Sequence, residues 1–194
     1  VYKMVLVCDT SDITNCGQFV NIQLDGMFLR RPISVCDYNE ENAKQTAEEI
    51  LALGVGSMTA VCDVRDREKI FSFVNEAIER FGKVDYLVNN AGGSAKLLNK
   101  LTDFVDSEQS TLDFVRDTNL KGSMHCIQAV LPSMIEQKYG KIVSISSIAA
   151  VCGLLKRVDY AAAKAGLIGM TKALAMEVGK HNVFVNCISP GAIE

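Results

Sequence analysis

The run KIVSIS at residues 141–146 is short and rich in β-branched side chains, and the run VFVNCI at residues 183–188 has the same character. Between them lies YAAAKAGLIGMTKALAMEVGK, residues 160–180, whose length is typical of a helix. A strand, a helix and a second strand in this order predict a βαβ unit, in which the two strands are parallel. This part of the chain therefore predicts a parallel sheet.

The same alternation extends along the rest of the chain. We expect further strands at residues 3–8, 33–36, 57–62 and 86–89, and helices at 39–53, 67–81, 110–137 and 159–180. This order predicts an α/β fold with a doubly wound, Rossmann-like parallel sheet in three layers. Because no linker or repeat divides the sequence, residues 1–194 are expected to form a single dinucleotide-binding catalytic domain.

Composition and charge exclude several classes of protein. The 194 residues are 48% hydrophobic and carry a formal net charge of −3, so neither disorder nor a nucleic-acid or membrane partner is indicated. No apolar run reaches the ~20 residues of a spanning helix, and we expect a cytoplasmic protein. The seven cysteines and two histidines lack the spacing of a metal site, so we expect no metal, and we expect the thiols to be buried and reduced.

Tyr160 and Lys164 are the first candidates for chemistry. They stand four residues apart in the expected helix, so both project from one face. An ammonium beside a phenol favours the phenolate, and a tyrosine tuned in this way can exchange a proton with an alcohol oxygen. Ser147 follows the strand at 141–146, where its hydroxyl could hold a carbonyl, whereas Ser144 and Ser146 share a face of the strand and are interpreted as structural.

Other candidates also directly follow a strand, where doubly wound sheets bind their ligands. They are Asp37, Asp63, Asn90, Ala91, Gly92, Pro190 and Gly191. An acid at the end of the second strand can accept hydrogen bonds from both hydroxyls of an adenosine ribose and repels a 2′-phosphate. Asp37 therefore predicts NAD(H) in preference to NADP(H); the alternative is that it starts a turn or caps the next helix.

Five motifs resemble those of the short-chain dehydrogenases/reductases, in that family's order. They are NNAG (89–92), DTNLKG (117–122), GKIVSISS (140–147), YAAAKAG (160–166) and VNCISPG (185–191). The chain is most similar to the 3-oxoacyl-carrier-protein reductase-like branch. The resemblance implies a secondary alcohol or ketone substrate, for example a 3-oxoacyl compound, and a homodimer or homotetramer built through the helices that carry Asn119 and Tyr160.

The resemblance also implies a role for each matched residue. Tyr160 would be the general acid/base, Lys164 would lower its pKa and hydrogen-bond the nicotinamide ribose, and Ser147 would polarise the carbonyl. Asn119 would hold a water in a proton relay; without the motif it is equally well an amide inside a helix. For the cofactor, Asp63 and Val64 would contact adenine, Asn90, Ala91 and Gly92 would let it approach closely, and Pro190 and Gly191 would shape the nicotinamide pocket.

Two regions depart from the family pattern. The glycine-rich turn expected after the first strand is replaced by residues 9–17, in which only Gly17 matches. The sequence also stops at Glu194, so the usual C-terminal substrate-loop region is expected to be lacking. Two functions stay open: an NAD-dependent oxidoreductase, and a non-catalytic, oligomer-forming relative that has lost cofactor binding. The presence of Asn119, Ser147, Tyr160 and Lys164 favours the enzyme.

Overall fold

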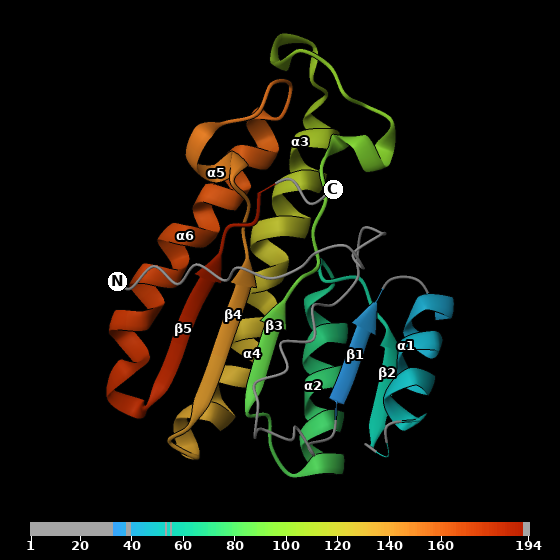
Figure 1. Cartoon of the computed structure of the whole chain (residues 1–194), viewed down its shortest axis with the longest axis vertical. Helices are drawn as coiled ribbons and strands as arrows, with labels where there is room; N and C mark the ends of the chain where they lie inside the picture. The colour runs from blue at the N-terminus through green and yellow to red at the C-terminus, as the bar shows by residue number, and fades with distance from the viewer. Residues whose placement is uncertain (1–32, 38–39, 53, 55, 192–194) are drawn as a thin grey trace.

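The computed structural model describes residues 33–37, 40–52, 54 and 56–191 (Figure 1). The strand expected at residues 3–8 and the departure at 9–17 lie outside these residues. The strands are β1 (Ile33–Asp37), β2 (Ser57–Val61), β3 (Tyr86–Asn89), β4 (Gly140–Ile145) and β5 (Val183–Ile188). The α-helices are α1 (Glu40–Ala52), α2 (Arg67–Phe81), α3 (Gln109–Arg116), α4 (Gly122–Glu136), α5 (Ala149–Cys152) and α6 (Val158–Val178).

All described strand pairs are parallel, as predicted. β1 pairs with β2, and β4 pairs with both β3 and β5, so that Ser144 lies between Asn89 and Cys187. The strands point the same way in Figure 1, with their carboxyl ends at one edge. Where we expected one sheet, the described strands form two, because no ladder of hydrogen bonds joins β1 or β2 to β3 in this part of the chain.

Helix α2 links the two sheets. It begins where the Asp66 carboxylate accepts a hydrogen bond from the Lys69 backbone N–H at 3.1 Å, and it ends at Gly82, whose φ of 84° favours glycine. Its residue Phe73 packs with Met58 of β2, whereas Ile70 belongs to the main core. One side of α2 therefore packs against β2, and another side is part of the main core.

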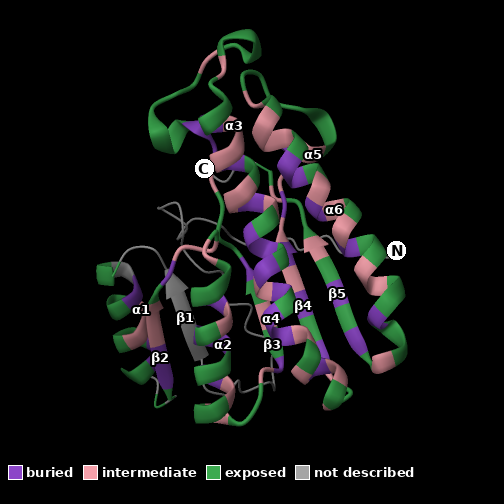
Figure 2. Ribbon diagram, turned by 180° about the vertical axis from the view of Figure 1, so that it is seen from behind, coloured by how far each residue is buried: buried purple, intermediate pink, exposed green. Residues whose placement is uncertain are grey.

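The main core lies between the three-stranded sheet and helices α4 and α6. Figure 2 shows the buried residues along β4, β5 and the helices that cover them. They include Ile127, Val130 and Met134 of α4, Ile142 of β4, Val178 of α6, and Val183 and Val185 of β5. A Cβ on Gly140 would lie 2.5 Å from the Met134 sulfur, so β4 starts in direct contact with the end of α4.

The region expected as one helix at 110–137 is helical but not uniform. Between α3 and α4, residues Asp117–Lys121 form a π-helical turn, η3, with Asn119 at its centre. Such turns are often found at functional sites. Three short elements were not predicted: the 3₁₀ turns η1 (Ala95–Leu98) and η2 (Phe104–Asp106), and α5. A further 3₁₀ turn, η4 (Gly179–His181), ends the helical region after α6.

Two further observations concern membrane-spanning helices and thiols. In the described ranges, no helix combines the length and the apolar character needed to cross a bilayer. Four cysteines there are free: Cys62 is buried, Cys126 and Cys187 are half-buried, and Cys152 is exposed. The expectation of buried thiols is therefore wrong for Cys152, which lies at the exposed end of α5.

Candidate active site

The predicted site residues lie after the strands, at one edge of the structure. Asp63 follows β2, Asn90 follows β3 and Ser147 follows β4. Asp37 is the last residue of β1 and lies opposite Val61 of β2; its side chain is outside the described part of the structure. Parallel pairing brings these four positions to the edge where α/β sheets bind ligands.

The segments after β4 and β5 are hydrogen-bonded to each other. The Ser146 N–H donates to the Ile188 carbonyl at 2.7 Å, and the Ile148 N–H donates to the Pro190 carbonyl at 2.8 Å. Pro190 is half-buried and Gly191 is exposed. The pairing of the two strands thus continues past their ends and places Pro190 beside the segment that contains Ser147.

Tyr160 and Lys164 lie on the same face near the start of α6. Lys164 is buried, with 4% of its surface exposed, and its Nζ lies 5.6 Å from the centre of the Tyr160 ring. The same Nζ donates to the Ile145 carbonyl at the end of β4, at 2.6 Å. Burial lowers the pKa of Lys164 from 10.5 to about 8, against an opposing effect of Cys187. This ammonium is therefore held beside the phenol at the end of β4.

The three serines near the end of β4 differ in their surroundings. Ser144 is fully buried, and Ser146 is buried with its hydroxyl donating to the Lys164 backbone carbonyl at 2.7 Å. Ser147 is half-buried, and its Oγ accepts a hydrogen bond from the Ala149 N–H at 3.2 Å. Because the Ser147 oxygen accepts that bond, its own proton is available to a carbonyl oxygen.

The Asn119 amide is fully buried, and it is bonded to the loop after β3 and to its own helix. Its Oδ1 accepts from the Gly93 N–H at 3.1 Å, and its Nδ2 donates to the Gly93 carbonyl at 2.6 Å and to the Val115 carbonyl at 2.8 Å. The Asn119 backbone carbonyl accepts from the Ser123 hydroxyl at 3.0 Å. The side chain thus clamps the loop; the water-holding role stays a prediction.

The loop clamped by Asn119 lies at the surface. Asn90, Ala91 and Gly92 are all exposed. A Cβ on Gly92 would lie 2.6 Å from Asn119 Oδ1 and 3.0 Å from Lys164 Nζ. A side chain at position 92 would press on both of these groups, so residues 92, 119 and 164 pack against one another.

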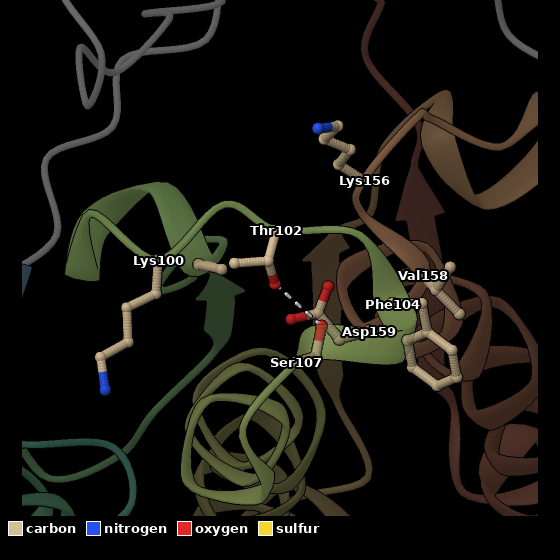
Figure 3. Close-up of a pocket in the computed structure, with 8 residues that line it drawn as sticks. Lys100, Thr102, Phe104, Ser107, Lys156, Val158 and Asp159 are labelled. Carbon is tan, nitrogen blue, oxygen red and sulfur yellow. Dashed lines mark hydrogen bonds between the residues drawn. The ribbon is translucent and has the colours of Figure 1, made fainter.

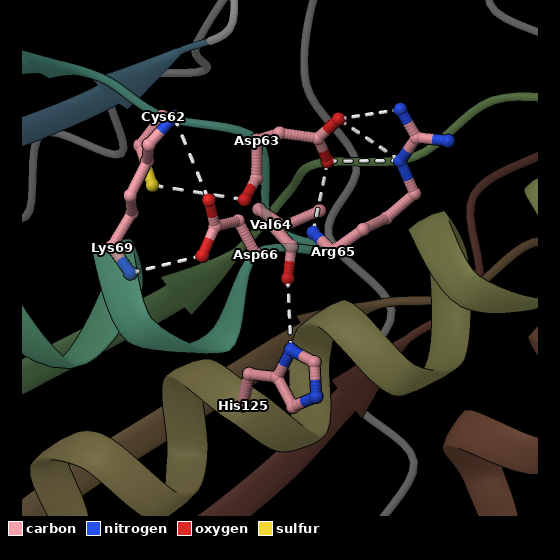
Figure 4. Close-up of polar contacts among 7 residues, drawn as sticks. All are labelled: Cys62, Asp63, Val64, Arg65, Asp66, Lys69 and His125. Carbon is pink, nitrogen blue, oxygen red and sulfur yellow. Dashed lines mark hydrogen bonds and ion pairs between the residues drawn. The ribbon is translucent and has the colours of Figure 1, made fainter.

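A second polar cluster fills the turn after β2 (Figure 4). The Arg65 backbone N–H donates to Asp63 Oδ1 at 2.9 Å, and its guanidinium Nε lies 3.0 and 2.9 Å from the two carboxylate oxygens. These hydrogen bonds hold the pKa of the Asp63 carboxyl below its usual range. The guanidinium also lies over the Phe114 ring of α3, 4.8 Å from its centre. Asp63 is therefore an ionised acceptor in a fixed position.

Sequence reasoning missed one side chain in this cluster, His125. It is buried on α4, and its Nδ1 lies 3.0 Å from the Val64 carbonyl. One turn earlier, a Cβ on Gly122 would lie 2.6 Å from Val64 Cγ2. The sequence signal that could have found it is a polar residue among the apolar positions of α4.

A rim of exposed apolar side chains borders the site. It comes from the η1–η2 segment and from the segment around α5. The exposed residues are Leu97, Leu98, Leu101, Phe104, Val105, Ile148, Val151, Leu154, Leu155 and Val158. Two contacts join the segments. The Arg157 guanidinium donates a hydrogen bond to the Ser94 hydroxyl, and Lys156 forms an ion pair with Asp103 at 3.5 Å. Figure 3 shows the small pocket between them, next to Asp159 at the start of α6.

The donors and acceptors along this edge suit a dinucleotide. The Asp63 carboxylate accepts only, as an adenine amino group requires, and Arg65 already donates to both of its oxygens. Lys164 supplies a buried ammonium, which can donate three hydrogen bonds, close to Tyr160. The described residues therefore fit the two ends of a nicotinamide cofactor.

Comparison with known proteins agrees with this interpretation. The family described as short chain dehydrogenase matches residues 30–194. The 3-oxoacyl-[acyl-carrier-protein] reductase FabG of Staphylococcus aureus is 37% identical over 155 residues, which are 80% of this chain and 61% of that protein. The (2S)-[(R)-hydroxy(phenyl)methyl]succinyl-CoA dehydrogenase subunit BbsD of Thauera aromatica is 38% identical over 162 residues, 83% of this chain and 62% of that protein.

A solved structure is also similar. NAD+-bound xylitol dehydrogenase matches with a TM-score of 0.77 and 32% identity, covering 82% of this chain and 60% of that one. This likeness confirms the predicted α/β fold with a parallel, Rossmann-like sheet. The chain spans about three fifths of the length of the three relatives, given the 61%, 62% and 60% that it covers.

Proposed function

The chain belongs to the short-chain dehydrogenase family, and on that premise we propose that it is an NAD(P)(H)-dependent oxidoreductase that interconverts a secondary alcohol and a ketone. The observation that carries the proposal is the pair of Tyr160 and Lys164. A buried lysine whose ammonium lies 5.6 Å from the centre of a half-buried tyrosine ring is a costly arrangement. It is explained if Tyr160 transfers its proton and the Lys164 ammonium stabilises the phenolate that is left.

Each of the four predicted catalytic residues has a task in this reaction. The Tyr160 hydroxyl gives a proton to the carbonyl oxygen in reduction and takes one from the alcohol in oxidation. The Ser147 hydroxyl donates a hydrogen bond to the same oxygen, and the Lys164 ammonium stabilises the phenolate. Asn119 acts by fixing the loop at Gly93. A nicotinamide cofactor, when bound, supplies or accepts the hydride.

The cofactor would lie along the edge formed by the loops after the strands. Asp63 and Val64 would hold its adenine, the backbone of Asn90, Ala91 and Gly92 would lie against its centre, and Lys164, Tyr160, Pro190 and Gly191 would surround the nicotinamide half. Asp37, at the end of β1, supports NAD(H) in preference to NADP(H), because a carboxylate there repels a 2′-phosphate.

The apolar rim supports a carbonyl substrate with a hydrophobic chain, such as a 3-oxoacyl compound. The η1–η2 segment and the α5 segment expose leucine, valine and phenylalanine beside the start of α6. Such a surface gains free energy by covering an alkyl or aryl chain, at about 25 cal/mol per Å² of apolar area removed from water. A polyol substrate has no apolar chain that could cover this rim. A cytoplasmic location belongs to the same proposal.

A homodimer or homotetramer is also part of the proposal. The outer side of α6 exposes small residues at helical spacing, among them Ala162, Ala165, Gly169 and Ala173. Near the C-terminal end of this side lies Met176, which is 86% exposed. On α4, Met124 is exposed as well. Small residues allow two helices to approach closely. Analytical ultracentrifugation of the chain and of Ala165→Glu tests this: the variant is expected to be monomeric, and a monomeric wild type contradicts it.

Titration with NADH, with NADPH in parallel, tests the oxidoreductase. We expect NADH to bind more tightly than NADPH, and Asp37→Ala to weaken NADH binding and reduce the preference. Glu136→Ala, which removes an exposed carboxylate at the end of α4, is the control for net charge. If neither nucleotide binds while the chain still forms oligomers, the non-catalytic alternative replaces the enzyme.

A further inference from the structure

We propose that His125 is a positioning residue for the turn that holds the adenine of the cofactor. The inference rests on the proposed function, because it takes Asp63 and Val64 as the adenine contacts. It adds a residue that does not itself touch the cofactor. His125 acts instead through the backbone of Val64, 61 residues away in the sequence.

The contact itself is a hydrogen bond with a fixed direction. His125 is 7% exposed on α4, and its Nδ1 lies 3.0 Å from the Val64 carbonyl oxygen (Figure 4). Because a carbonyl oxygen only accepts, Nδ1 carries the proton. A buried polar ring is costly on an apolar helix unless it is hydrogen-bonded. The side chain at this position is therefore matched to the Val64 carbonyl.

The same helix holds Val64 by its side chain. A Cβ on Gly122 would lie 2.6 Å from Val64 Cγ2 and 2.8 Å from Val64 Cβ, so the valine rests on bare backbone of α4. Gly122 and His125 are three residues apart and thus neighbours on one face of the helix. Two independent contacts, one to the carbonyl and one to the side chain, fix Val64 relative to α4.

The helix that positions Val64 also positions the loop after β3. Asn119, in the π turn that leads into α4, is bonded to both backbone polar groups of Gly93. One helical segment therefore sets the places of the adenine turn and of the loop next to Lys164. A shift of Val64 relative to this segment would misalign one end of the cofactor site while the other stayed in place.

Three substitutions separate this role from simple packing. His125→Leu fills the space but cannot donate to the Val64 carbonyl. His125→Asn places an amide N–H close to the position of Nδ1, whereas His125→Gln places its amide nearer to Nε2. His181→Leu is the matched control, since the other histidine of the chain lies in η4, after the C-terminal end of α6.

The test is calorimetric titration of each variant with NADH and with ADP, which carries the adenine half alone. A lost hydrogen bond is worth roughly a factor of five in affinity. We expect His125→Leu and His125→Gln to bind both ligands about fivefold more weakly, and His125→Asn and His181→Leu to bind as the wild type does. Faster amide hydrogen exchange of Arg65 and Asp66 is expected in the first two variants without ligand.

The possible results distinguish the two proposals. Equal affinities in the wild type, His125→Leu and His125→Gln overturn the role of His125 and leave the oxidoreductase intact. Weak binding by His125→Asn overturns it too, because that variant keeps the donor. If His125→Leu does not fold, His125→Gln against His125→Asn makes the same comparison. A wild type that binds neither NADH nor ADP overturns the proposed function, and the inference with it.

Discussion

The side-chain amide of Asn119 is paired with both backbone polar groups of Gly93, accepting from its N–H at 3.1 Å and donating to its carbonyl at 2.6 Å. Two hydrogen bonds between the same pair of residues fix both the position and the orientation of the Gly93 backbone relative to Asn119. Since Asn119 sits in a π turn and Gly93 follows β3, the pairing ties the long helical region to the carboxyl edge of the sheet.

Replacing Asn119 by Ala is expected to destabilise the protein by about 2–4 kcal/mol, because the Gly93 and Val115 groups lose their buried partner. Urea unfolding followed by circular dichroism measures the change. Gln128→Ala, an exposed site on α4, is the control and should change the free energy of unfolding by less than about 0.5 kcal/mol. A loss equal to that of the control would show that the clamp contributes nothing.

Replacing Tyr160 by Phe should lower turnover by about 10²–10⁴ and leave the affinity for NADH nearly unchanged, because only the proton-transferring hydroxyl is removed. Steady-state kinetics with a panel of apolar ketones and NADH titration give the two quantities. Tyr139→Phe is the matched control: its hydroxyl bonds to that of Tyr86, at the amino end of β3, and its turnover should equal that of the wild type. Full turnover by Tyr160→Phe contradicts the assigned proton transfer.

The sequence predicted the regular elements closely. β3, β5 and α2 have the bounds that alternation and helical periodicity indicate. The π turn around Asn119 was not predicted, because five residues of wider helix leave the pattern of apolar positions nearly unchanged. The turns η1 and η2 are too short to show a period.

The candidate site was predictable only where residues follow strands or share a helix face. Tyr160 and Lys164 belong to one helix, so their spacing suffices to bring them together. His125 and Val64 meet only through packing of α4 on the turn after β2, and no local pattern contains that contact. For the same reason the buried partner of Lys164, the Ile145 carbonyl, could not be foreseen.

Lys164 should make stability depend on pH in the alkaline range. Its pKa is lowered by burial from 10.5 to about 8, so between these values the unfolded chain binds more protons than the native one. The free energy of unfolding then rises with pH, by at most about 1.4 kcal/mol per unit. Relative to Lys164→Met, the wild type should gain about 2 kcal/mol between pH 7.5 and 9.5. If the free energy of unfolding changes equally with pH in the two proteins, the lowered pKa of Lys164 is contradicted.

Replacing Gly92 by Ala tests whether the loop after β3 contacts both Asn119 and Lys164. The added methyl would lie 2.6 Å from Asn119 Oδ1 and 3.0 Å from Lys164 Nζ. Asn119 cannot withdraw without breaking its bonds to Gly93 and Val115, so the loop must move instead. Overpacking of this kind costs about 1–3 kcal/mol. NADH affinity should fall as well, because the displaced backbone is the surface proposed to approach the cofactor.

Gly179→Ala is the control for the added methyl group. No atom lies within 4 Å of its Cβ position, and the backbone at Gly179 is right-handed helical with a φ of −56°, a conformation that alanine adopts without strain. Its free energy of unfolding should therefore stay equal or rise, with unchanged NADH affinity. If Gly92→Ala behaves like Gly179→Ala in both measurements, the loop has room for a side chain, and the close packing of residues 92, 119 and 164 does not shape the site.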